Sequence, residues 1–242
     1  MIALMSIFTW FEIVLCFVLF IPFQIILFIL TALFDKRRRI MHFHSGLWCW
    51  LALALSPLWH VKISGRENLD YNKSHVVIMN HQSLIDILIA FRLFYPVKMI
   101  GKKVLAFVPI VGWNLFLSGH LLVDRKNLKS QMNAIRRMEK IIGSGDSLLV
   151  FPEGTRTKDG NLLDFKKGAF RSASSTGTPL LPVVIDGPYQ ILPRKGFIVN
   201  GRRDIIIRIM PPIPVEKGTS PAELAKSSRE VMADELEKIR KE

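Results

Sequence analysis

The apolar and polar positions divide the chain near residue 60. Residues 13–33 are apolar apart from Gln24 and Thr31, and about 20 apolar residues are enough to span a bilayer. A second apolar run, residues 47–59, is too short to span comfortably and contains three tryptophans, which favour the headgroup level. The pattern predicts an N-terminal two-helix membrane anchor whose second helix lies shallow. The alternative is that both runs are buried helices of a soluble core.

Four basic residues, Lys36 to Arg39, follow the first run directly. Positive charges beside a membrane segment favour the cytoplasmic side. If the second run stays in the interface, the rest of the chain lies on the same side as these charges. We therefore expect a membrane protein whose catalytic domain is on the cytoplasmic face.

Beyond residue 60 the apolar runs become short and rich in Val and Ile, which is typical of buried strands. Predicted strands are Val76–Met79, Val97–Ile100, His120–Val123, Leu148–Phe151, Leu181–Ile185 and Ile205–Met210. Predicted helices are Ser83–Phe94, Leu128–Ile142, Phe165–Ser175 and a last helix that starts at Ser220. Leu224, Val231, Met232, Leu236 and Ile239 form one apolar stripe on the last helix, which should dock on the domain.

Strands that alternate with helices predict an α/β fold with a mainly parallel sheet flanked by helices. We expect two parts. Residues 1–60 form the membrane-associated helical hairpin, and residues 61–242 form the α/β domain with its C-terminal docking helix. The chain length of 242 residues fits this division.

The charge of the chain points to anionic partners. The formal net charge is +13, and residues 1–60 contribute only +2 of it. A basic domain of this kind fits a phospholipid surface, nucleic acid or phosphorylated substrates. The sequence contains no GxSxG nucleophile elbow, no Walker A motif and no GxGxxG motif, so a serine nucleophile and those nucleotide sites are unsupported.

The segment Asn80–Asp86, NHQSLID, directly follows a predicted buried strand. Positions five apart do not share a helix face, so His81 must precede the helix that carries Asp86. Ser83 is the predicted N-cap, which puts Asp86 near the end of the first turn. A carboxylate there can accept one imidazole N–H and leave the other ring nitrogen as a general base. A histidine that only bonds the backbone at a strand end is the alternative.

A second junction, Glu153-Gly154-Thr155-Arg156, follows another predicted strand and suits an anion. Gly154 lets the backbone approach a ligand closely, and Arg156 can bind phosphate in a bidentate manner. Lys103 and Arg125 also follow predicted strands. Because ligands of open α/β sheets bind at the carboxyl ends of strands, these basic residues are candidates for one anion site.

With these segments identified, the chain resembles the 1-acylglycerol-3-phosphate acyltransferases of the glycerolipid acyltransferase family. NHQSLID is similar to the HxxxxD block of that family. The second block is matched by GKKVLAFVPIVGW with HLLVDR, the third by FPEGTRT with FKKGAF, and the fourth by LLPVVIDG. The resemblance covers residues 61–214, and the combination of HxxxxD with FPEGTR some seventy residues later is highly specific.

The resemblance implies a reaction and a role for each candidate residue. His81 would deprotonate the free hydroxyl of lysophosphatidic acid, which attacks a fatty acyl thioester of coenzyme A or acyl carrier protein and gives phosphatidic acid. Asp86 would orient His81. Glu153, Gly154, Thr155 and Arg156 would hold the glycerol phosphate, helped by Lys103 and Arg125. The family implies no metal and no cofactor, and a phospholipid membrane as a partner.

Two alternatives remain open. The acceptor can be glycerol 3-phosphate or another lysophospholipid within the same class of enzyme. A non-catalytic basic protein that binds anionic lipid or nucleic acid is the alternative from another class. We expect no nucleic-acid partner, because the resemblance implies acyl transfer.

Overall fold

The computed structural model describes residues 2–56, 58–194, 196–201 and 203–242. Its centre is a seven-stranded sheet in the order β1-β7-β6-β2-β5-β3-β4. The strands are β1 (Trp59–Ser64), β2 (Val76–Met79), β3 (Val97–Lys102), β4 (Leu121–Val123), β5 (Ser147–Val150), β6 (Leu180–Asp186) and β7 (Arg203–Ile209). Paired strands run parallel except β6 and β7, which are antiparallel. The predicted mainly parallel sheet is confirmed.

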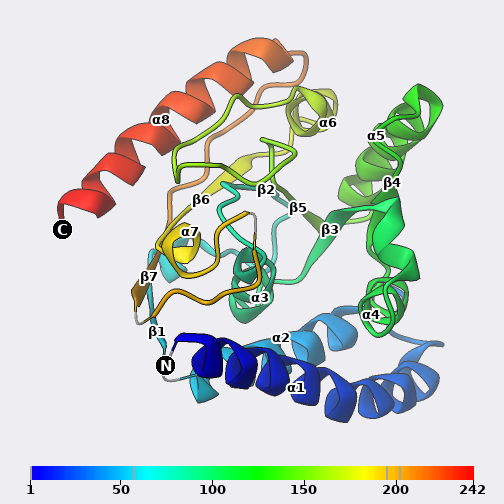
Figure 1. Ribbon diagram of the computed structural model, residues 1–242. Coiled ribbons are helices and arrows are strands. Elements are labelled where there is room, and N and C mark those ends of the chain that lie inside the picture. The colour runs from blue at the N-terminus through cyan, green and yellow to red at the C-terminus, as the bar shows by residue number, and fades with distance from the viewer. Residues whose placement is uncertain (1, 57, 195, 202) are drawn as a thin grey trace.

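Helices cover both faces of the sheet (Figure 1). They are α1 (Ile2–Thr31), α2 (Arg39–Leu55), α3 (Ile85–Arg92), α4 (Val111–Leu117), α5 (Leu128–Gly143), α6 (Gly168–Thr176), α7 (Pro188–Ile191) and α8 (Pro221–Lys241). Two 3-10 helices, η1 (Arg66–Asn68) and η2 (Lys103–Phe107), complete the described elements. Helices α1, α2 and α3 pack into one core, and α5, α6 and α8 pack into the other.

Strand β2 shows how the apolar run builds both cores. Val77 and Met79 lie in the core beneath α2 and α3, whereas Val76 and Ile78 lie in the core beneath α6 and α8. Successive side chains of a strand point to opposite faces, so an unbroken apolar run is required where both faces are covered. This buried strand fixes the position from which the NHQSLID segment emerges.

The start of α3 differs from the prediction. The helix begins at Ile85, with Leu84 rather than Ser83 at the cap position, and Asp86 is its second residue. The hydroxyl of Ser83 instead donates to the carbonyl of Leu192 at 2.8 Å. Asp86 Oδ2 accepts the backbone N–H groups of Gln82 and Ser83, and this turn replaces the expected cap.

Several elements with weak sequence patterns were not predicted. Strand β1 was not predicted, because Trp59 falls at the end of the second apolar run. The helix formed by that run ends at Leu55, and β1 begins at Trp59. The short helices η2, α4 and α7 were missed as well. The prediction for α8 is confirmed at its start, where Ser220 Oγ accepts the N–H of Glu223, and over most of the stripe. Val231 is the exception and is exposed.

The two N-terminal helices pack against each other and against the domain. The segment Ala3–Thr31 of α1 is, among the described residues, the one helix long and apolar enough to cross a membrane by length and composition. Helix α2 buries Trp48, Cys49 and Leu53 in the same core as α3. The division of the chain at residue 60 stays a prediction.

Candidate active site

His81 and Asp86 meet as the spacing predicted. Nδ1 of His81 lies 2.8 Å from Oδ2 of Asp86. The histidine stands in the turn after β2, and the carboxylate comes from the first turn of α3. The His81 side chain is 15% exposed and that of Asp86 is fully buried. Because Nδ1 is engaged with Asp86, Nε2 is the ring nitrogen left for a substrate.

The imidazole is held in one orientation by its surroundings. Its ring stacks on Phe151, with 4.1 Å between ring centroids and an interplanar angle of 21°. Asp86 Oδ2 is itself fixed by the N–H groups of Gln82 and Ser83, at 2.6 and 2.8 Å. A carboxylate held by two backbone donors keeps its position when the imidazole gains or loses a proton.

Glu153 lies behind the histidine and bridges two backbone segments. Its Oε1 accepts the N–H of His81 at 2.8 Å, and its Oε2 accepts the N–H of Leu163 at 3.1 Å. Burial raises the pKa of Glu153 to about 7, although the two N–H donors oppose that shift. Burial has the larger effect, because the hydration free energy that a carboxylate loses on burial exceeds what two hydrogen bonds restore. Both carboxylate oxygens are thus occupied by protein groups.

A cavity of about 510 Å³ lies where the segments that follow β3, β4 and β5 meet. Its polar lining consists of Lys102, Lys103, Asp124, Arg125, Lys126, Gly154 and Thr155, and its apolar lining comes from η2 and β4. Arg125 Nη1 donates to the carbonyl of Gly154, and burial lowers the pKa of Arg125. Four of the residues predicted for anion binding therefore share one cavity: Lys103, Arg125, Gly154 and Thr155.

Gly154 occupies a position that demands glycine. Its φ is +69°, in the left-handed region. A Cβ there would stand 2.8 Å from Nζ of Lys166. The turn therefore brings a lysine from the start of the next segment against the backbone of the FPEGTR loop.

Arg156 lies outside the lining of that cavity and beside a second arginine. Burial, followed by the nearby charge of Arg194, lowers the pKa of Arg156. Arg194 Nη1 donates to the backbone carbonyl of Arg156 at 3.2 Å. Two guanidinium groups held close together favour an anion between them. Glu153 likewise does not line the cavity.

Three residues of the site were not found from the sequence. Phe151 belongs to a predicted strand and to the FPEGTRT block, and Gln82 belongs to the NHQSLID block, but the sequence predicts no role for either residue. Arg194 follows α7 and is separated from Arg156 by 38 positions, so no local pattern links them. Among the described residues, no group of three or more His, Cys, Asp or Glu side chains could hold a metal ion.

Comparison with known proteins links this geometry to a family. The family model described as acyltransferase matches residues 60–186, which contain the whole of the site described above except Arg194. A 1-acyl-sn-glycerol-3-phosphate acyltransferase of Chlamydomonas reinhardtii is 35% identical over 81% of this chain. The chain spans 61% of that relative's length, which is less than two thirds.

Two further relatives are similar over more of their own length. The 1-acyl-sn-glycerol-3-phosphate acyltransferase of Escherichia coli is 31% identical, over 78% of this chain and 78% of that protein. The crystal structure of the 1-acyl-sn-glycerophosphate (LPA) acyltransferase PlsC from Thermotoga maritima matches with a TM-score of 0.85 and 27% identity. That match covers 98% of this chain and 95% of the other, so the N-terminal helices are included.

Proposed function

This chain belongs to the acyltransferase family, and from that premise we propose that it transfers a fatty acyl group to the free hydroxyl of a 1-acylglycerol 3-phosphate. The donor is an acyl thioester of coenzyme A or acyl carrier protein, and the product is phosphatidic acid. The observation that carries the proposal is the His81–Asp86 pair, 2.8 Å apart, together with a cavity lined by Lys102, Lys103, Arg125 and Lys126.

His81 acts as the general base. Nε2 takes the proton of the acceptor hydroxyl while its oxygen forms a bond to the thioester carbonyl carbon. Asp86 stabilises the imidazolium through Nδ1–H. The tetrahedral intermediate then collapses, the carbon–sulfur bond breaks, and the imidazolium returns the proton to the leaving thiolate. A base of this kind contributes about 10²–10⁴-fold in rate.

The phosphate of the acceptor binds among the basic groups of the FPEGTR loop and the adjacent cavity. Lys103 and Arg125 line that cavity, and Arg156 stands beside Arg194. Gly154 and Thr155 supply a backbone turn that a phosphate can approach. Glu153 was expected to help hold the phosphate; its two bonds to backbone N–H groups support a different role, in which it fixes the loop and leaves ligand contact to the basic residues.

The membrane supplies the acceptor and receives the product. Helix α1 contacts the domain near both of its ends: Ser6 Oγ accepts the N–H of Val199, and Gln24 Nε2 donates to Ser118 Oγ. A helix of 30 residues is about 45 Å long. A helix that is docked along this length cannot also run straight out of the domain through a bilayer. We therefore propose that α1 lies in the plane of the interface, with its exposed apolar side chains in the lipid.

The acceptor can be tested through the arginine of the FPEGTR loop. Arg156→Ala should raise the KM for lysophosphatidic acid about tenfold to a hundredfold, because a charge-assisted hydrogen bond contributes about 1.5–3 kcal/mol. The KM for acyl-CoA should change much less. Arg171→Ala, which removes an exposed arginine of α6, is the matched control and should leave both values unchanged.

Initial rates with a panel of acceptors distinguish the alternatives. We expect lysophosphatidic acid to be preferred over glycerol 3-phosphate and over lysophosphatidylcholine, whose phosphate is a diester. Equal increases of both KM values in Arg156→Ala would contradict a phosphate role for this residue. Equal use of lysophosphatidylcholine would contradict recognition of a phosphate monoester.

A further inference from the structure

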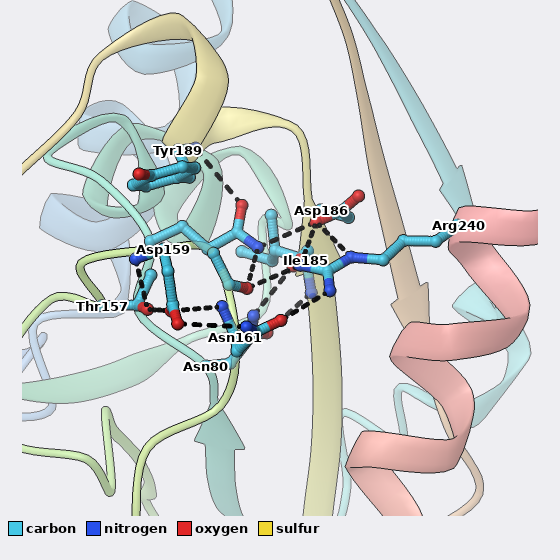
Figure 2. Close-up of polar contacts among 10 residues, drawn as sticks. Asn80, Thr157, Asp159, Asn161, Ile185, Asp186, Tyr189 and Arg240 are labelled. Carbon is cyan, nitrogen blue, oxygen red and sulfur yellow. Dashed lines mark hydrogen bonds and ion pairs between the residues drawn. The ribbon is translucent and has the colours of Figure 1, made fainter.

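Two arginines of the C-terminal helix bind the backbone of the loop that follows the FPEGTR turn. Arg240 Nη2 donates to the carbonyl of Gly160 at 2.7 Å. Arg229 donates to the carbonyls of Leu162 and Leu163, each at 3.1 Å. Figure 2 shows Arg240 reaching from α8 toward Asp186 and the loop. Three backbone carbonyls of segment 160–163 thus accept hydrogen bonds from side chains of the C-terminal helix.

The sequence of the loop fits this contact. Gly160 has φ +87°, and a Cβ there would lie 3.2 Å from Nη2 of Arg240 and 3.3 Å from Cδ1 of Tyr189. Both the backbone conformation and the close approach of the guanidinium therefore favour glycine. The preceding residues close the turn on themselves, because Asp159 accepts from the Thr157 hydroxyl and from the side chain of Asn161.

The same guanidinium is connected to the turn that carries the base. Arg240 Nε and Nη2 each lie 3.4 Å from Oδ1 of Asp186, at the end of β6. Gln82 Nε2 donates to that oxygen at 2.9 Å and to the Gly160 carbonyl at 3.2 Å. Gln82 directly follows His81 in the sequence. Arg240, Asp186, Gln82 and Gly160 form one hydrogen-bonded cluster beside the catalytic turn.

A second connection runs from Leu163 to the backbone of His81. Arg229 holds the Leu163 carbonyl, and the Leu163 N–H donates to Glu153 Oε2. The other oxygen of Glu153 accepts the N–H of His81, and the His81 carbonyl accepts the N–H of Thr157 at 2.9 Å. The loop and the histidine turn are therefore fixed to each other, and α8 fixes the loop.

These contacts are not needed to dock α8. Leu224, Met232, Leu236 and Ile239 bury the apolar stripe of the helix in the core. Arg208 of β7 binds Glu235 Oε1 of α8 at 2.9 Å and Oε1 of Glu242, the residue after the helix, at 2.8 Å. Arg229 and Arg240 instead donate to loop carbonyls. A guanidinium that donates to several carbonyls at once favours the one backbone conformation in which all of them can accept.

We propose that Arg229 and Arg240 are positioning residues for acyl transfer, which set the FPEGTR loop and, through Gln82 and Glu153, the base His81. The inference rests on the proposed function, because it names which part of the chain aligns the phosphate-binding loop with the base. Helix α8 then holds the loop in place and also packs on one face of the sheet. Misplacement of a base or a phosphate by about 1 Å can cost about 10²-fold in rate.

The test compares three variants of the full chain in detergent micelles: Arg240→Met, Arg240→Lys and Arg208→Met. Arg208→Met is the matched control, since it removes an arginine that binds α8 but not the loop. We expect Arg240→Met to lower kcat with lysophosphatidic acid and acyl-CoA at least tenfold, and Arg240→Lys to recover part of the loss. Arg208→Met should lower the thermal midpoint and keep kcat within about twofold.

Hydrogen exchange gives a readout that does not depend on turnover. Amides of residues 157–163 and of 81–83 should exchange faster in Arg240→Met and in Arg229→Met than in the wild type, but not in Arg208→Met. Unchanged exchange there in Arg240→Met, or equal kcat in Arg240→Met and Arg208→Met, would overturn the positioning role. A wild-type protein that does not acylate lysophosphatidic acid would instead refute the proposed function, while the exchange data would still decide whether α8 holds the loop.

Discussion

At the scale of single residues, two buried carboxylates serve His81 in different ways. Asp86 contacts the imidazole itself and is fixed by two backbone N–H groups. Glu153 contacts only the backbone of the histidine and of Leu163. Asp86 therefore fixes the orientation of the imidazole ring, whereas Glu153 fixes the position of the His81 backbone. Substitution of the two residues should consequently have different effects on stability and on rate.

The raised pKa of Glu153 predicts a pH dependence of stability. Its pKa is about 7 in the folded protein against an ordinary value of 4.5, so between these values the folded state binds more protons than the unfolded state. The stability due to this proton is fully present below about pH 4.5 and is lost as pH rises through 7. The slope from one proton is at most about 1.4 kcal/mol per pH unit.

Glu153→Gln should flatten that slope in thermal unfolding followed between pH 5 and 7.5. Glu230→Gln, which changes an exposed carboxylate of α8, is the control and should keep the wild-type slope. If wild-type protein and Glu153→Gln lose the same stability over this pH range, Glu153 is not the group responsible.

At the scale of elements, helix α1 has two faces of different chemistry. Gln24 on its inner face is fully buried in a network with Ser45, Asn114 and Ser118, which joins α1 to α2 and α4. The outer face is apolar and open: Phe23 is 62% exposed and Ile26 is 53% exposed. A buried polar network specifies where α1 docks, and the exposed side chains are available to lipid.

The two faces can be separated by substitution. Gln24→Leu removes the buried hydrogen bonds that Gln24 makes with Ser45, Asn114 and Ser118, so it should cost about 1–3 kcal/mol of stability and lower the thermal midpoint. The pair Phe23→Ser and Ile26→Ser should keep the thermal midpoint and weaken flotation with vesicles of phosphatidylglycerol and phosphatidylcholine. Unchanged flotation of this pair would contradict an outer face that binds lipid, and Gln24→Leu provides the reciprocal control.

Elements with a strong local pattern could be predicted, and those defined by distant partners could not. Helix α5 begins at Leu128 because the Asn127 side chain accepts the N–H of Ser130. An asparagine directly before a helical pattern predicts such a cap from the sequence. Helix α4 has no such signal, since Gly112 lies near its start and packs against the backbone of Ala106. The pairing of His81 with Asp86 follows from a spacing of five residues, whereas Arg240 and Gly160 are 80 positions apart. Contacts of that second kind arise only when the sheet brings its strand ends together.

At the scale of the whole molecule, strand order explains why the site residues meet. Strands β2, β5, β3 and β4 are neighbours and run parallel, so the segments that follow them emerge at one edge of the sheet. His81 follows β2, Gly154 follows β5, Lys103 follows β3 and Arg125 follows β4. Figure 1 shows α1 along one flank of the molecule and α8 on the opposite flank, with the sheet between them. The helix that we propose meets lipid, α1, and the helix that we propose holds the loop, α8, are therefore separate parts of the fold.

The most direct test of the account is acyl transfer by His81→Ala. Thiol release from acyl-CoA would be followed in the presence of lysophosphatidic acid, for wild-type protein, for His81→Ala and for His60→Ala, which removes an exposed histidine of β1. Loss of the general base should lower kcat about 10²–10⁴-fold in His81→Ala, whereas His60→Ala should match the wild type. A His81→Ala protein that is folded and transfers acyl groups at the wild-type rate would contradict the account.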